Sequence, residues 1–152
     1  MARPIKLILV LSVLAAAACS TDVAAPQNEY NGIRYTAAVA PNGIGFTVIV
    51  TLENTGGVPQ ARTYPAACPV RIRLYRTADN LRLYDETTWP CDATNTATIT
   101  VDAFSSKTLQ SGARSVTTVT GDSLPHTAYT VYAVVRTEGV TLVEVRAGLL
   151  SL

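Results

Sequence analysis

The chain has little of what catalysis and metal binding use most. Histidine occurs once, as His126, and the three cysteines are widely spaced, at positions 19, 68 and 91. A lone histidine has no second imidazole with which to hold a metal ion, and no Gly-x-Ser-x-Gly turn is present to carry a serine nucleophile. We therefore expect no catalytic residues, no metal and no cofactor, and we interpret His126 as a solvated loop residue.

Paired acids and phosphate-binding loops are lacking as well. The nearest approach to a carboxylate pair is Asp85-Glu86, whose side chains would point to opposite faces of a strand, which argues against acid–base work. The glycines of Asn54-Thr55-Gly56-Gly57 do not open a helix, so this segment is interpreted as a turn and not as a nucleotide site.

The chain also lacks a strong charge of either sign. It carries 12 basic and 11 acidic residues, and without Arg3 and Lys6 these become 10 basic against 11 acidic. A nearly neutral protein has no field with which to attract a nucleic acid, so we expect no nucleic-acid partner.

No apolar run is long enough to span a bilayer, which takes roughly 20 residues. The apolar segment 7–14 follows Arg3 and Lys6 and is followed by four alanines, a pattern typical of a secretory signal. Residues 1–18 are therefore predicted to be a signal peptide.

The end of this segment, Leu14-Ala15-Ala16-Ala17-Ala18-Cys19, resembles the lipobox of bacterial lipoproteins. The resemblance implies cleavage before Cys19, attachment of a diacylglyceryl group to its thiol (a palmitate-bearing anchor) and attachment of the protein to a membrane of the cell envelope. Ser20, with no aspartate beside it, is similar to lipoproteins passed to the outer membrane where the host has one. An ordinary signal peptide with an unrelated cysteine is the alternative. Residues 19–31, small and polar, would form a flexible tether of at most roughly 40 Å.

Setting Cys19 aside leaves Cys68 and Cys91. An even pair in an exported protein predicts a disulfide, and two free thiols are the alternative.

Beyond the tether, short alternating segments separated by turn residues predict an all-β domain over 32–152. Asn42-Gly43 suits a two-residue type I′ turn. Counting outward from it places eight apolar side chains on one face of a hairpin. The predicted pairs are Val39–Phe46, Ala37–Val48, Tyr35–Val50 and Ile33–Leu52.

A second hairpin is predicted from Val70 to Arg76 and back from Leu81. Its inner face would pair Leu74 with Leu83, and its outer face would pair Tyr75 with Arg82, Arg73 with Tyr84 and Arg71 with Glu86. Asp85 would face inward opposite Ile72, so we expect the pairing to fail near it. The same register brings Cys68 within two residues of Cys91.

Weaker strands are predicted at Thr98–Val101 and Ser115–Val119, with Ile99, Val101, Val116 and Val119 in the core. A last hairpin turns at Thr137-Glu138-Gly139. It aligns Tyr129, Val131, Ala133 and Val135 with Val143, Val145 and Ala147. Three hairpins with one apolar face each predict a two-layer sandwich.

Four segments carry a further resemblance: Phe46-x-Val48-x-Val50, Asn54-x-Gly56, Leu109-x-Ser111-Gly112 and Ala128-Tyr129-Thr130-Val131. With them the chain resembles an immunoglobulin-like β-sandwich and, more narrowly, the BsuPI-type proteinase inhibitor domain. That resemblance implies the fold and, as one activity, inhibition of a protease. The leader, the cysteine pair and the proline-containing loop before the second hairpin depart from it.

The expected function is therefore that of a lipid-anchored, non-catalytic envelope protein whose sandwich binds a protein or ligand; a proteinase inhibitor is the alternative. Arginine and tyrosine are enriched at interfaces, which makes the outer face of the second hairpin the candidate binding surface, unless these residues only pair among themselves. A second candidate is the loop from Pro59 to Pro69. The predicted surface consists of Arg71, Arg73, Tyr75, Arg82, Tyr84 and Trp89.

Overall fold

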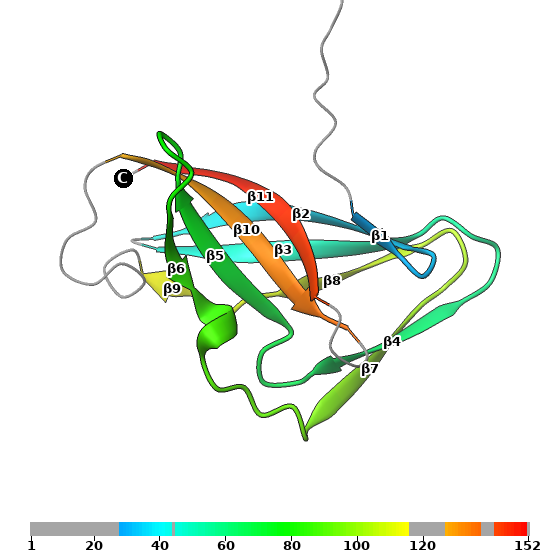
Figure 1. Ribbon diagram of the computed structural model, residues 1–152. Helices are drawn as coiled ribbons and strands as arrows, with labels where there is room; N and C mark the ends of the chain where they lie inside the picture. Colours follow the sequence, from blue (N-terminus) through cyan, green and yellow to red (C-terminus); the bar gives the residue numbers. More distant parts are fainter. Residues whose placement is uncertain (1–27, 44, 116–126, 138–141, 152) are drawn as a thin grey trace, which may run out of the picture.

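The computed structural model describes residues 28–43, 45–115, 127–137 and 142–151. They form two antiparallel sheets, which cross one another in Figure 1, and a separate two-stranded ribbon. The prediction of an all-β sandwich is confirmed. The predicted signal peptide, Cys19, most of the tether, Val116, Val119 and His126 lie outside the described residues. Within those residues no helix is long and apolar enough to cross a membrane.

The first sheet has the order β1-β2-β3-β8, with β9 also on β3. Its strands are β1 (Asn28–Tyr30), β2 (Ile33–Asn42), β3 (Gly45–Asn54), β8 (Ser106–Gln110) and β9 (Arg114–Ser115). Strands β8 and β9 follow the same edge of β3, and Ser111 lies between them. The hydroxyl of Ser111 accepts a hydrogen bond from the Val48 amide at 3.0 Å, so the interrupted edge keeps its pairing.

The start of the domain differs from the prediction. Residues Asn28–Tyr30, assigned to the tether, form β1 and pair with β2. The connection is the two-residue turn Asn31-Gly32, both with positive φ (49° and 77°), as a type I′ turn requires. Asn-Gly occurs twice in this chain, and the first copy was the signal for this hairpin.

The β2–β3 hairpin has the predicted faces but not the predicted register. Tyr35 lies opposite Leu52 rather than Val50, and the last pair before the turn is Asn42 with Gly45. The register is therefore two residues away from the prediction. Because side chains alternate with a period of two, such a shift leaves every apolar side chain on its predicted face.

The second sheet has the order β11-β10-β5-β6. Its strands are β5 (Val70–Arg76), β6 (Arg82–Asp85), β10 (Ala128–Arg136) and β11 (Leu142–Ser151), and the short 3₁₀ helix η1 (Glu86–Thr88) follows β6. The predicted side chains face one another, but the register is two residues away from the one that a turn at 137–139 implies: Val135 lies opposite Val143 and Ala133 opposite Val145. A bulge then shifts the register beyond Tyr132. Of the predicted turn at 137–139, residues 138 and 139 lie outside the described part.

A second bulge corrects the prediction for the β5–β6 hairpin. Tyr75 does lie opposite Arg82, but Leu74 then faces Tyr84 and Arg73 faces Asp85. Leu83 is the extra residue and is 38% exposed, whereas Tyr84 packs against the core in its place. An unpaired residue turns every following side chain to the other face. Pairing ends at Asp85, where it was expected to fail.

The predicted loop from Pro59 to Pro69 contains a strand. Its residues Gln60–Pro65 form β4, which pairs with β7 (Thr96–Val101) in a ribbon below the sheets in Figure 1. Pro65 is tolerated because β4 pairs on one side only and is therefore an edge strand. The ribbon brings Tyr64 and Val101 into the core, while Ile99 packs against it from a half-buried position.

The core lies between the inner faces of the two sheets and is closed at one end by the ribbon. Its members from the first sheet are mainly aromatic and β-branched, and Val131, Ala133 and Val135 supply the centre of the second. At roughly 25 cal/mol per Å² of buried apolar surface, this shared core is the main stabilising term. Its largest fully buried side chains include Tyr35, Tyr64, Tyr129, Phe46, Ile33, Leu52, Ile72 and Leu74.

Asn54, 1% exposed, ties the end of β3 to the ribbon. Its side-chain amide donates to the carbonyls of Val58 (2.8 Å), Val101 (3.1 Å) and Asp102 (3.2 Å), and its oxygen accepts from the Gly56 amide at 3.0 Å. One side chain therefore satisfies four backbone groups where two loops meet.

We expect Asn54→Ala to lower the free energy of unfolding by about 2 kcal/mol, because partly buried carbonyls lose their donor. Urea denaturation monitored by circular dichroism measures the loss. Asn95→Ala makes the same deletion at an exposed asparagine and should cost under about 0.5 kcal/mol. Equal losses in the two variants would contradict this role.

Candidate functional site

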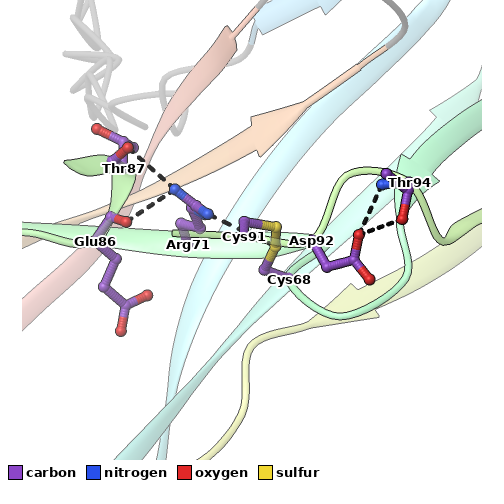
Figure 2. Close-up of a disulfide and its surroundings, with 7 residues drawn as sticks. All are labelled: Cys68, Arg71, Glu86, Thr87, Cys91, Asp92 and Thr94. Carbon is purple, nitrogen blue, oxygen red and sulfur yellow. Dashed lines mark hydrogen bonds between the residues drawn. A yellow bond between two sulfur atoms is a disulfide. The ribbon is translucent and has the colours of Figure 1, made fainter. Parts of the chain in front are cut away.

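Cys68 and Cys91 form the predicted disulfide, with Cα atoms 6.3 Å apart. It joins the segment that precedes β5 to the segment that follows η1 (Figure 2). The bond therefore fixes the frame on which the neighbouring side chains are arranged.

Arg71 lies beside this disulfide on the outer face of β5. Its guanidinium donates to the carbonyls of Glu86 (2.9 Å) and Thr87 (3.1 Å), and its other terminal nitrogen lies 3.7 Å from the sulfur of Cys68. The predicted pairing of the Arg71 and Glu86 side chains is thus wrong: Arg71 contacts the main-chain carbonyl of Glu86. Figure 2 shows the Glu86 carboxylate directed away from Arg71. The guanidinium is held in place without a carboxylate partner among the described residues.

Arg73, by contrast, is neutralised. It contacts Asp85 (3.1 Å) and Glu144 (2.6 Å), and Asp85 also pairs with Arg82 at 3.0 Å. Burial alone would raise the pKa of Asp85, but hydrogen bonds from Thr87 and then Arg73 outweigh it, so this pKa lies below its ordinary value. These side chains neutralise one another and leave little charge with which to bind a ligand.

Glu86 is the most buried acid described, at 3% exposure. Its carboxylate accepts from the Ile72 amide (3.0 Å), the Tyr84 hydroxyl (3.0 Å) and Arg114 (2.5 Å). The bond to Glu86 raises the pKa of Arg114, and burial followed by the negative charge of Glu86 raises the pKa of Tyr84. Since Arg114 belongs to β9, this contact clamps the first sheet to the second.

The two remaining residues of the predicted surface lie apart from each other. Tyr75 packs edge-on against Tyr132 at 5.2 Å on the outer face, and Trp89 packs edge-on against Tyr84 at 5.4 Å beside η1. Trp89 is 51% exposed. The structure therefore brings Arg73, Arg82 and Asp85 together on the outer face, while the bulge removes Tyr84 from it.

A pocket of about 170 Å³ lies next to the disulfide, on the outer face of the second sheet. Val134, which is 1% exposed, lines the pocket from the sheet. Pro65 and the disulfide line it from the segments that cover the sheet. Arg71, Thr87, Arg136 and Leu142 complete the lining. Sequence reasoning missed Arg136, Val134 and Leu142, because they come from the third hairpin and meet Arg71 only through the pairing of β10 with β5.

The carboxylates of Asp85 and Glu86 accept hydrogen bonds from their own scaffold, and no group of three or more metal-ligating side chains gathers among the described residues. What is left unpaired in this part of the molecule is positive charge beside an apolar surface.

No protein-family model matches the chain, and no curated protein matches it.

Proposed function

We propose that this protein is a non-catalytic binding domain held at the cell envelope by a lipid on Cys19. The observation that carries the binding part is the pocket beside the disulfide, where Arg71 is fixed by main-chain carbonyls and keeps an unneutralised charge. Pockets with few, well-positioned polar groups on an apolar lining are typical of ligand sites.

Two features support the envelope location. The segment that ends in Ala17-Ala18-Cys19 resembles a lipobox after a short apolar run. The domain behind it contains a disulfide, a bond that persists in oxidising compartments and is rare in the cytosol. The lipid would belong to Cys19 alone, since the other two cysteines are used by each other. We further propose that the sandwich is of the immunoglobulin-like kind.

Substitution of the anchor cysteine tests this location. Cys19→Ser should release the protein from the membrane fraction or leave it uncleaved, because serine cannot form the thioether to the lipid. Fractionation of cells of a bacterial host, followed by immunoblotting, measures this. Ser20→Ala is the matched control and should stay membrane-bound and processed. A Cys19→Ser chain that is processed to the wild-type size and still stays in the membrane fraction would remove the anchor.

A proteinase inhibitor is the second candidate, and one segment favours it. Ala66 and Ala67 are exposed between the end of β4 and the disulfide at Cys68, and the Ala66 amide donates to the Asn95 carbonyl at 2.9 Å. A segment held at both ends loses little freedom on binding a protease. A panel of serine proteases assayed with micromolar full-length protein tests this; absence of inhibition across the panel would dismiss it.

A further inference from the structure

The lining of the pocket beside the disulfide specifies more than a general binding role. Arg71 and Arg136 both line it, and neither has a carboxylate partner in the described part of the chain. Arg71 is already fixed by the carbonyls of Glu86 and Thr87, so no side-chain freedom is left for it to lose when an anion binds.

The nearby acids are occupied elsewhere. Glu144, on the neighbouring strand β11, pairs with Arg73, and Glu86 pairs with Arg114. Asp92, next to Cys91, accepts from the amide and hydroxyl of Thr94, and Figure 2 shows it directed toward Thr94 and not toward Arg71. Because no described acid competes for the two arginines, an anion from outside is their complement.

The rest of the lining indicates which chemical group the anion carries beside its charge. Val134, Leu142, Pro65 and the disulfide are apolar, and Leu142 is 47% exposed although it is a large aliphatic side chain. A volume of about 170 Å³ is well below the roughly 300–1,000 Å³ of pockets for drug-sized ligands. It suits a group the size of one aliphatic side chain.

Building on the binding function proposed above, we propose that this pocket binds a carboxylate that carries a compact aliphatic group, with Arg136 and Arg71 holding the carboxylate and Leu142 and Val134 contacting the aliphatic part. A free acyl amino acid and the C-terminal residue of a peptide share this chemistry. A planar guanidinium matches a carboxylate with two parallel hydrogen bonds.

The test is a titration of ¹⁵N-labelled full-length protein in an uncharged maltoside detergent, followed by backbone amide shifts. N-acetyl-leucine should shift amides around Thr87, Val134 and Leu142 and should bind roughly tenfold more tightly than N-acetyl-leucinamide, which lacks the charge. The peptide Ala-Ala-Ala-Leu and its C-terminal amide form the second pair. Tighter binding by the peptide acid than by the free acyl amino acid assigns the site to peptide ends; the reverse assigns it to small acids.

Arg136→Gln is the decisive variant, because the Arg136 side chain makes no hydrogen bond or ion pair within the described residues whose loss would harm the fold. It should weaken binding of N-acetyl-leucine at least fivefold. Arg146→Gln removes an exposed arginine from β11 outside the residues that line the pocket and should leave binding unchanged.

Three results would overturn the proposal: equal binding of acid and amide, equal binding by Arg136→Gln, or binding of inorganic phosphate as tight as that of N-acetyl-leucine. The mass of the chain at Cys19, measured on the same sample, separates this failure from that of the envelope function. If the chain is lipidated but does not bind carboxylates, the proposed location stands and only the proposed ligand is contradicted.

Discussion

Replacing Glu86 with alanine should lower the free energy of unfolding by about 3–5 kcal/mol, the range for removing one partner of a buried ion pair. The carboxylate is 3% exposed and serves the Ile72 amide, the Tyr84 hydroxyl and Arg114 together. Its loss leaves the Ile72 amide and the Tyr84 hydroxyl without an acceptor and leaves Arg114 with an uncompensated charge. The loss also disconnects β9 from the second sheet.

Urea denaturation of the full-length protein in detergent measures this effect, with Glu86→Gln and Glu53→Ala as controls. The glutamine keeps the shape and one acceptor oxygen, so we expect a smaller loss, about 1–2 kcal/mol. Glu53 makes a surface pair with Arg34 at 3.4 Å, for which about 0–1 kcal/mol is expected. A loss as small for Glu86→Ala as for Glu53→Ala would show that the clamp is not structural.

Removing the disulfide should have the second large effect. The sequence separation of 23 residues corresponds to about 3.5 kcal/mol of loop-closure free energy in the chain-entropy model. Cys68→Ala combined with Cys91→Ala should therefore lower the melting temperature by about 10–15 °C for a domain of this size. The loop that the bond closes contains β5, β6 and η1, hence Arg71 and its two carbonyl acceptors.

Differential scanning calorimetry with and without reductant separates this effect from the loss of two half-buried sulfur-containing side chains. Reductant should lower the melting temperature of the wild-type protein by a similar amount and leave that of the double variant unchanged. The stabilising role of the bond would be contradicted if reductant made the wild-type thiols titratable but left the melting temperature unchanged.

Alternation in the sequence predicts which residues are buried more reliably than which residues are paired. Val48, Val50 and Leu52 are buried as expected, because a period of two assigns them to one face. The same period cannot distinguish a register from one shifted by two residues, and the β2–β3 hairpin differs from the prediction by that amount. The first Asn-Gly, at Asn31-Gly32, was hidden by the polar residues around it.

Irregular features of the strands could not be predicted from the sequence. The extra residue at Leu83 moves Tyr84 to the core side and Asp85 to the outer face, and no local pattern marks it. The strand β4 was hidden by small residues and by Pro59 and Pro65. The disulfide, in contrast, followed from an even number of cysteines once Cys19 was set aside.

The sequence predicted only part of the candidate site, because local patterns do not show which distant strands become neighbours. Arg71 belongs to the predicted surface and lines the pocket, but its partners there are main-chain carbonyls and the disulfide rather than a facing acid. Arg136 and Val134 join it from a strand more than 60 positions later in the numbering. Such a meeting depends on strand order, which alternation does not encode.

The intact mass of the full-length product, extracted from the membranes of a bacterial host without reductant, tests the proposed role most directly. We expect a chain that begins at Cys19, is heavier by a diacylglyceryl group and a fatty acyl chain, and is two hydrogens lighter than the reduced form because Cys68 and Cys91 are joined. A chain that retains residues 1–18 with three free thiols would contradict export, anchoring and the oxidised frame of the pocket together.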